Sequence, residues 1–127
     1  MFFSSKSERS SFYWSPFLDK LEGTQRVETT TIDAVLNGLS ADVVKMDIEG
    51  SEPAALRGME KVLKPETVLF IEFNPNTLTA AENDPNEFGW SLHERFARIE
   101  VIGRNQLVPF DQPPTDLANL RCSGWQG

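Results

Sequence analysis

Residues 41–60 read ADVVKMDIEGSEPAALRGME. The first part is apolar and predicts a core strand over Val43–Ile48, in which Val44, Met46 and Ile48 share one face. Acidic residues and a glycine follow this strand, and apolar residues then recur at helical spacing. The stretch therefore predicts a strand, a turn and a helix in succession.

The predicted helix begins after Ser51, because serine is a common N-cap residue and Pro53 is tolerated in a first turn. Gly58 lies within the helix, and we expect it to permit close approach to a sheet. Pro65 ends the helix. The apolar stripe of this helix consists of Ala55, Leu56, Met59, Val62 and Leu63.

A second core strand is predicted over Thr67–Phe73, which reads TVLFIEF. A strand, a helix and a strand of these lengths form a βαβ unit, so the two strands should be parallel. Upstream, Gln25–Thr31 is rich in β-branched residues and predicts a short strand. A two-turn helix should follow it, with Thr31 as N-cap and Gly38 near its C-terminal end.

The C-terminal part predicts shorter elements. Residues 77–89 read as a loop with room for a helical turn near Leu78 to Glu82, and residues 90–96 read as a short helix. Residues 97–102 and 106–110 predict an antiparallel hairpin. Residues 116–122 are ambiguous, and we expect the last residues of the chain to be frayed. These elements predict the α/β fold class.

Residues 1–24 differ in composition from the predicted α/β domain of residues 25–127. They are rich in serine, which favours an irregular arm, and in aromatic residues, which favour packing on the core. A flap that covers a substrate is the functional alternative for this arm. Its aromatic residues include Phe2, Phe3, Phe12, Tyr13, Trp14 and Phe17.

Composition excludes several classes of protein. The net charge of −7 argues against binding to a nucleic acid. Cys122 is the single cysteine, so no internal disulfide or thiolate metal cluster is expected, and a cytoplasmic location fits. No apolar run reaches the roughly 18 residues of a membrane span, so we expect no membrane partner.

Four polar residues follow the two predicted core strands. Asp47 and Glu49 come after the first strand, and Glu72 and Asn74 come at the end of the second. Because parallel strands end on the same edge of a sheet, all four should meet where open α/β sheets bind ligands. Burial beside like charge would raise a carboxyl pKa and suit it to general-base catalysis. The sequence therefore predicts a site at this edge.

Each of these residues also has a structural explanation. Glu49 and Asn74 are residue types found in turns, and Glu72 could pair with Lys45 across the sheet. A metal site built from the three carboxylates is a further alternative, but no ligand-loop spacing is present and we predict no metal. His93 has no partner motif, and we interpret it as a surface or packing residue.

Three segments resemble the C-terminal half of the FkbM-type methyltransferases. They are TTTID at residues 29–33, VVKMDIEGSEPAALRGME at residues 43–60 and VLFIEFNP at residues 68–75. The resemblance covers residues 25–122 and implies a Rossmann-like, three-layer sheet closed by an antiparallel strand. Val43–Ile48 and Thr67–Phe73 would be its fourth and fifth strands.

The resemblance also implies a function. The family uses S-adenosylmethionine, so we expect methyl transfer to an oxygen of a small-molecule acceptor or sugar. Asp47 would lie near the transferred methyl group and is the one expected cofactor contact, while Glu49 and Glu52 match the acids of the motif. Nothing upstream of Val43 resembles the glycine-rich loop or the acid that hold this cofactor, so the chain looks like half of such a domain.

The alternative interpretation is a non-catalytic interaction module, or a truncated member of the family. Without N-terminal strands, Val43–Ile48 would form an open sheet edge. Such an edge invites pairing with a missing half or with a second copy of the chain.

Overall fold

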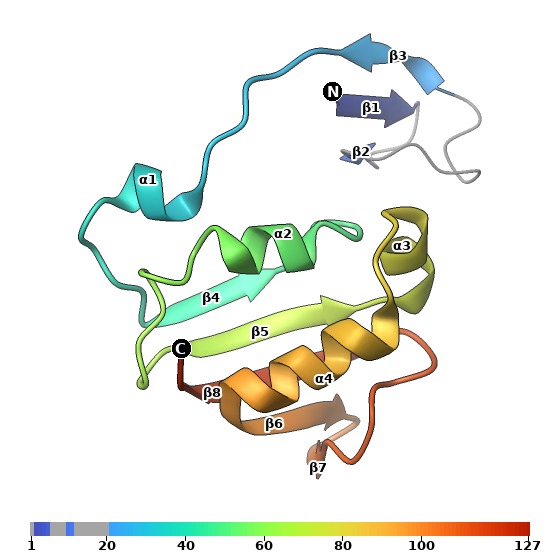
Figure 1. The fold of residues 1–127 in the computed structure, drawn as a ribbon. Coiled ribbons are helices and arrows are strands. Elements are labelled where there is room, and N and C mark those ends of the chain that lie inside the picture. Colours follow the sequence, from blue (N-terminus) through green and yellow to red (C-terminus); the bar gives the residue numbers. More distant parts are fainter. Residues whose placement is uncertain (1, 6–9, 12–20) are drawn as a thin grey trace.

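The computed structural model describes residues 2–5, 10–11 and 21–127, and its main body is a five-stranded sheet with helices (Figure 1). The helices are α1 (Ile32–Leu36), α2 (Glu52–Arg57), α3 (Pro75–Ala80) and α4 (Pro85–Arg95). The strands of this sheet are β4 (Val43–Met46), β5 (Val68–Phe73), β6 (Phe96–Gly103), β7 (Gln106–Pro109) and β8 (Ala118–Trp125).

The strands of the main sheet lie in the order β4-β5-β8-β6-β7. β4 and β5 are parallel, with Met46 beside Ile71, and α2 lies between them in sequence. This arrangement confirms the predicted βαβ unit. β6 and β7 are antiparallel, which confirms the predicted hairpin. The fold class is therefore mixed α/β, as predicted.

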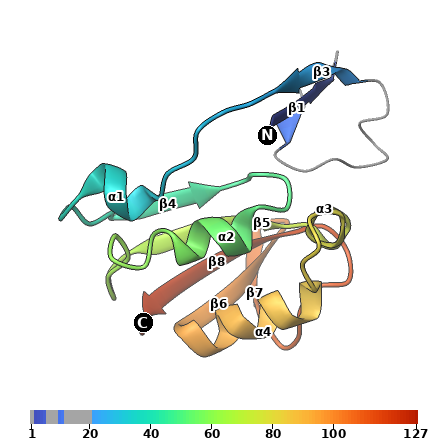
Figure 2. The ribbon, with the colours of Figure 1, turned by 45° about the horizontal axis from the view of Figure 1, so that its top comes forward.

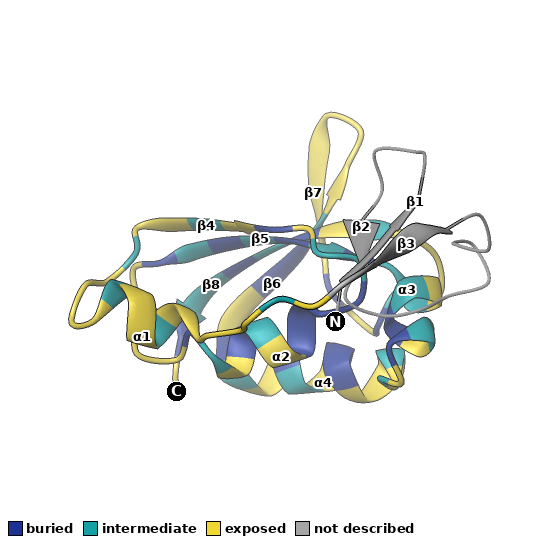
Figure 3. Ribbon diagram, turned by 90° about the horizontal axis from the view of Figure 1, so that it is seen from above, coloured by how far each residue is buried: buried dark blue, intermediate teal, exposed yellow. Residues whose placement is uncertain are grey.

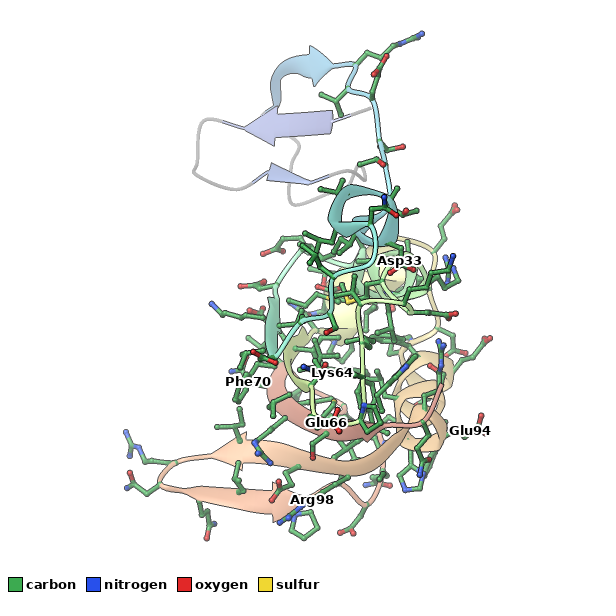
Figure 4. All side chains as sticks on the ribbon, turned by 90° about the vertical axis from the view of Figure 1, so that its left-hand side faces the viewer. Asp33, Lys64, Glu66, Phe70, Glu94 and Arg98 are labelled. Atoms are coloured by element: carbon green, nitrogen blue, oxygen red, sulfur yellow. The ribbon has the colours of Figure 1, made fainter. Side chains whose placement is uncertain are left out.

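One face of the sheet carries the helices and the core. α1, α2 and α4 all lie on this side (Figure 3), and α2 runs alongside β4 and β5 (Figure 2). Phe70 lies on the opposite side of the sheet (Figure 4). The main sheet and its helices thus form two layers, and the three-layer arrangement stays a prediction. The largest fully buried side chains include Met59, Leu69, Ile71, Phe73, Leu78, Leu92, Leu120 and Cys122.

The helix predicted to run as far as Pro65 is shorter than expected. α2 ends at Arg57, and turns carry the chain through residues 58–62. The side chain of Asp33 accepts hydrogen bonds from the backbone N–H groups of Lys61 and Val62, which a longer helix would have used internally. Gly58 packs against Thr31 and not against the sheet, so that prediction was wrong as well.

The strand predicted over Gln25–Thr31 is wrong. β3 spans Leu21–Gln25, and residues 26–31 form a connection without regular structure. β-Branched residues favour a strand only where a neighbour can pair with it, and this segment has none in the described sheets. α1 agrees with the prediction, because the Thr31 hydroxyl accepts a hydrogen bond from the Ala34 N–H.

Part of the N-terminal arm has regular structure, contrary to expectation. β1 (Phe2–Ser5), β2 (Ser10–Ser11) and β3 form an antiparallel sheet of three strands. Phe12, Tyr13, Trp14 and Phe17, on which the flap alternative depended, lie outside the described residues. The boundary between an N-terminal arm of residues 1–24 and an α/β domain of residues 25–127 stays a prediction.

Helices α3 and α4 begin earlier than predicted. Each begins at a proline, and the preceding Asn74 or Asp84 caps the helix with its side chain. Most of the predicted loop at residues 77–89 is therefore helical. Proline is favoured at the first helical position, where its missing N–H costs nothing.

The chain ends in a central strand and not in frayed residues. β8 pairs with both β5 and β6, and Leu120 and Cys122 are fully buried. The strand pairs with segments far away in the sequence, so local signals near residues 116–127 could not reveal it. No helix in the described ranges has the length and apolar character needed to cross a membrane.

Candidate active site

Asp47 and Glu72 lie side by side where the parallel strands end. Met46 and Ile71 are register partners, and these two carboxyl residues come next along each strand. Burial raises the pKa of Glu72 most, followed by a hydrogen bond with Asp47 and the negative charges of Asp47, Glu49 and Glu52. The three predicted carboxylates therefore meet at this edge.

A left-handed turn positions Glu49. Glu49 and Gly50 have φ angles of 55° and 102°. A Cβ atom on Gly50 would lie 2.2 Å from the carbonyl oxygen of Thr77, so only glycine fits against α3. The Asn83 side chain donates a hydrogen bond to the Gly50 carbonyl oxygen at 3.1 Å. The acidic turn after β4 is thus held against the helices that follow β5.

Glu52 is buried directly behind this turn. Its carboxylate accepts hydrogen bonds from the N–H groups of Ile48 at 3.0 Å and Gly50 at 2.9 Å. Burial raises the pKa of Glu52. The sequence identified Glu52 as a motif acid but did not indicate that it holds the turn. Ser51, predicted as a side-chain cap, makes no such bond, and its buried Oγ has no partner in the described part of the chain.

Asn74 lies at the same edge but has a structural partner. Its side-chain oxygen accepts a hydrogen bond from the Asn76 N–H at 3.0 Å, which caps α3. The alternative pairing of Glu72 with Lys45 is not among the ion pairs of the described residues. Asn74 therefore has the structural role that its position in a turn suggested, and Glu72 is left facing Asp47.

A cavity of about 500 Å³ adjoins the carboxyl pair. Its size suits a small molecule, for which pockets typically measure about 300–1,000 Å³. It combines apolar and polar side chains from four strands, on the side of the sheet opposite the helices. The residues that line it include Val43, Phe70 and Ile102, together with Lys45, Asp47, Glu72 and Asn119. Sequence reasoning missed Ile102 and Asn119, because only the order of the strands brings β6 and β8 near β4 and β5.

Two other residues considered from the sequence lie in packing positions. His93 contacts the rings of Trp90 and Phe110, with ring centroids 5.6 and 5.9 Å apart. Burial raises the pKa of the Cys122 thiol to about 12. Among the described residues, no three histidine, cysteine, aspartate or glutamate side chains are placed to hold a metal ion. The metal-site alternative therefore gains no support from the carboxylates of this edge.

The fold and the site together define an α/β protein with an acidic edge and a cavity at the carboxyl ends of its parallel strands. The methyltransferase FkbM domain matches residues 1–102, and the chain belongs to this family. The match confirms the resemblance but begins earlier than residue 25 and ends before β7. No curated protein and no solved structure matches the chain significantly.

Proposed function

We propose that this chain supplies the acceptor side of a methyltransferase site that uses S-adenosylmethionine. The acceptor would be a hydroxyl group of a small molecule or sugar. The family supports methyl transfer. The observation that carries the proposal is the pairing of Asp47 with Glu72 beside a cavity of about 500 Å³.

The raised pKa of Glu72 suggests a different role for each of the two carboxyl groups. The raised pKa favours the protonated form of Glu72, which would donate a hydrogen bond to Asp47. Asp47 keeps a free carboxylate oxygen that accepts the hydroxyl hydrogen of the acceptor and orients its oxygen. Methyl transfer requires this orientation, because donor and acceptor must lie in line. Glu49 adds negative charge that favours the protonated form of Glu72.

The cavity suits an acceptor with both apolar and polar parts. Val43, Phe70 and Ile102 offer apolar contacts, while Lys45 and Asn119 offer a cation and an amide. The carbon skeleton of the acceptor would lie on the apolar residues, with its hydroxyl at Asp47.

The described residues do not provide a complete site for the cofactor. When bound, S-adenosylmethionine supplies the methyl group, and the family resemblance implies a glycine-rich loop that grips it. In the described sheets β4 has β5 as its one neighbour, so no strand beyond β4 presents such a loop. We therefore assign acceptor roles to this chain and derive no step through the cofactor.

A transfer assay tests the proposal. The 127-residue chain is incubated with methyl-labelled S-adenosylmethionine and a panel of sugars and small alcohols. If this chain binds the cofactor, the wild type should give labelled product and Asp47→Asn at least about a hundredfold less, the usual scale for loss of a general base. Asp116→Asn, at an exposed position, is the matched control and should behave as the wild type.

A calorimetric titration with S-adenosylhomocysteine accompanies this assay. The absence of both product and binding heat, from protein shown to be folded, would exclude catalysis by this chain alone. That outcome would favour the second candidate function, a non-catalytic module that pairs through the open edge of β4. The observation that favours this second candidate is the unpaired position of β4 in the described sheet.

A further inference from the structure

We propose that Glu52 is the positioning residue of the acidic edge. Each oxygen of its carboxylate holds the peptide group that directly follows one acid of this edge, Asp47 or Glu49. The proposal rests on the proposed function for the role of Asp47 toward an acceptor. It assigns control of that role to a side chain outside the lining of the cavity, and the arrangement can be measured without methyl transfer.

The two hydrogen bonds of Glu52 fall on the two peptide groups that follow the acids. Oε1 accepts from the Ile48 N–H at 3.0 Å, and Oε2 accepts from the Gly50 N–H at 2.9 Å. A peptide group is planar, so its N–H has a fixed orientation relative to the Cα atom of the preceding residue. The first bond therefore orients the peptide plane attached to Asp47, and the second orients the plane attached to Glu49.

Glu52 supplies acceptors where the backbone does not. In the part of the chain that the structure describes, no backbone carbonyl accepts a hydrogen bond from the N–H of Ile48 or Gly50. β4 ends at Met46, so Ile48 lies beyond the residues that pair with β5. The placement of the turn thus depends on a side chain and not on continued strand pairing.

The opposite side of the turn is also held. The Asn83 side chain donates a hydrogen bond to the Gly50 carbonyl oxygen at 3.1 Å. Gly50 is therefore bound through its N–H by Glu52 and through its C=O by Asn83. Because Asn83 lies just after α3, which follows β5, these bonds fix the turn relative to the strand end that carries Glu72. The carboxyl group of Asp47 consequently stays beside that of Glu72.

Satisfying two N–H groups does not by itself account for a carboxylate at this position. Glu52 is 3% exposed, and burying a charge costs free energy. Burial raises the pKa of Glu52, and the negative charge of Asp47 adds to this effect. An ionised carboxylate nevertheless offers two acceptor oxygens and no donor, whereas an amide side chain offers one acceptor oxygen. The carboxylate is therefore the side chain that can hold both peptide groups at once.

Two substitutions separate the position of the Glu52 carboxylate from its charge. Glu52→Asp keeps the negative charge but is one methylene shorter, so it cannot reach both N–H groups. Glu52→Gln keeps the length and one acceptor oxygen but removes the charge. Carbon-detected NMR titration of Glu72 then reports whether Asp47 still lies beside it. Circular dichroism checks that each variant is folded.

We expect Glu52→Asp to lower the pKa of Glu72 toward its ordinary value of 4.5, because Asp47 is no longer held against it. Glu94→Asp makes the same change at an exposed position of α4 and should leave the titration of Glu72 unchanged. If Glu52 acted through its charge alone, Glu52→Gln would lower the pKa of Glu72 and Glu52→Asp would not. That result would overturn the proposal.

Amide hydrogen exchange in the wild type tests the same bonds without a substitution. After correction for intrinsic rates, the N–H groups of Ile48 and Gly50 should exchange at least about tenfold more slowly than that of Asn105. This factor corresponds to the weak end of hydrogen bonds to charged groups. Asn105 is the matched control because it also has a positive φ angle, of 64°, in the exposed β6–β7 turn. Equal exchange at the three positions would overturn the proposal.

The outcomes also separate this proposal from the proposed function. A chain that gives no product in the transfer assay, but shows the expected titration and exchange, would lose the proposed function and keep the positioning role of Glu52. A chain that transfers methyl groups while Glu52→Asp leaves the titration of Glu72 unchanged would keep the function and lose that role.

Discussion

Asp33 and Val62 are joined by a hydrogen bond across 29 residues of sequence. The Asp33 carboxylate accepts it from the Val62 N–H at 3.1 Å, and also accepts from the Lys61 N–H at 3.0 Å. The Asp33 N–H in turn donates to the Gly58 carbonyl oxygen at 2.8 Å. Figure 4 shows Asp33 where α1 meets α2. Hydrogen bonds thus join the TTTID segment, residues 29–33, to the end of the segment at residues 43–60 and to the two residues that follow it.

Replacing Asp33 should destabilise the fold. Asp33→Ala leaves two N–H groups without their charged acceptor, so we expect a loss of about 1.5–3 kcal/mol in the free energy of unfolding. Asp33→Asn keeps one acceptor oxygen, so its free energy of unfolding should fall by less. Urea denaturation measures both variants, with Asp116→Ala at an exposed position as control. A loss no larger than that of the control would contradict this role of Asp33.

Gly50 and Gly38 form a matched pair for a test of close packing. Both have positive φ angles, of 102° and 86°, so alanine is strained at either position. A Cβ on Gly38 meets nothing within 4 Å, whereas one on Gly50 lies 2.2 Å from the Thr77 carbonyl oxygen. Gly38→Ala should therefore cost only about 1–2 kcal/mol, the strain of the left-handed region. Gly50→Ala should cost more than about 4 kcal/mol, because the clash adds to that strain. Equal losses by thermal unfolding would refute the contact with Thr77.

The carboxyl pair predicts a change of pKa on mutation. Asp47→Asn removes a negative charge beside Glu72, so the pKa of Glu72 should move down toward its ordinary value of 4.5. Carbon-detected NMR titration of the Glu72 carboxyl group measures this shift. Asp116→Asn is the control and should leave the titration of Glu72 unchanged. An unaltered titration in Asp47→Asn would show that the two groups do not interact.

Glu72 should also make stability depend on pH. Its pKa is raised in the folded protein, so its contribution is fully present below the unfolded value of 4.5 and is lost as the pH rises through the folded pKa. Glu72→Gln should therefore gain stability relative to the wild type as the pH increases from 4 to 7. Urea denaturation across this range measures the difference. Glu94→Gln, on the exposed surface of α4 (Figure 4), should follow the wild-type profile.

Cys122 should not react in the folded state. Its side chain is fully buried and its pKa is raised to about 12, so almost no thiolate forms at neutral pH. We expect slow labelling by a chromogenic disulfide reagent at pH 8 and rapid labelling after addition of guanidinium chloride. Rapid labelling before denaturation would mean that β8 opens readily.

The sequence predicted the parts of the fold that depend on neighbouring residues. The alternation in Val43–Ile48 and Thr67–Phe73 indicated two strands, and the helix between them required the strands to be parallel. That inference placed Asp47 and Glu72 at one edge of the sheet. Local pattern sufficed because strand periodicity and the geometry of a βαβ unit are properties of short segments.

The errors arose where distant residues replace local interactions. Gln25–Thr31 has the composition of a strand but finds no partner, and α2 ends early because Asp33 binds the N–H groups that would have extended it. Residues 118–125 looked like a chain end, yet they form a strand between β5 and β6. Propensity could not predict these outcomes, because each depends on a contact outside the segment.

The sequence by itself determined the α/β class, the parallel pair of core strands, the acidic edge and the family. Only the tertiary structure decided that Asp33 and Glu52 accept backbone hydrogen bonds, and that β8 brings Asn119 beside the carboxyl pair. It also placed β4 at an open edge. The division has a physical reason. Periodicity and turn chemistry act over a few residues, whereas buried polar partners, strand order and cavities depend on segments that only the folded chain brings together.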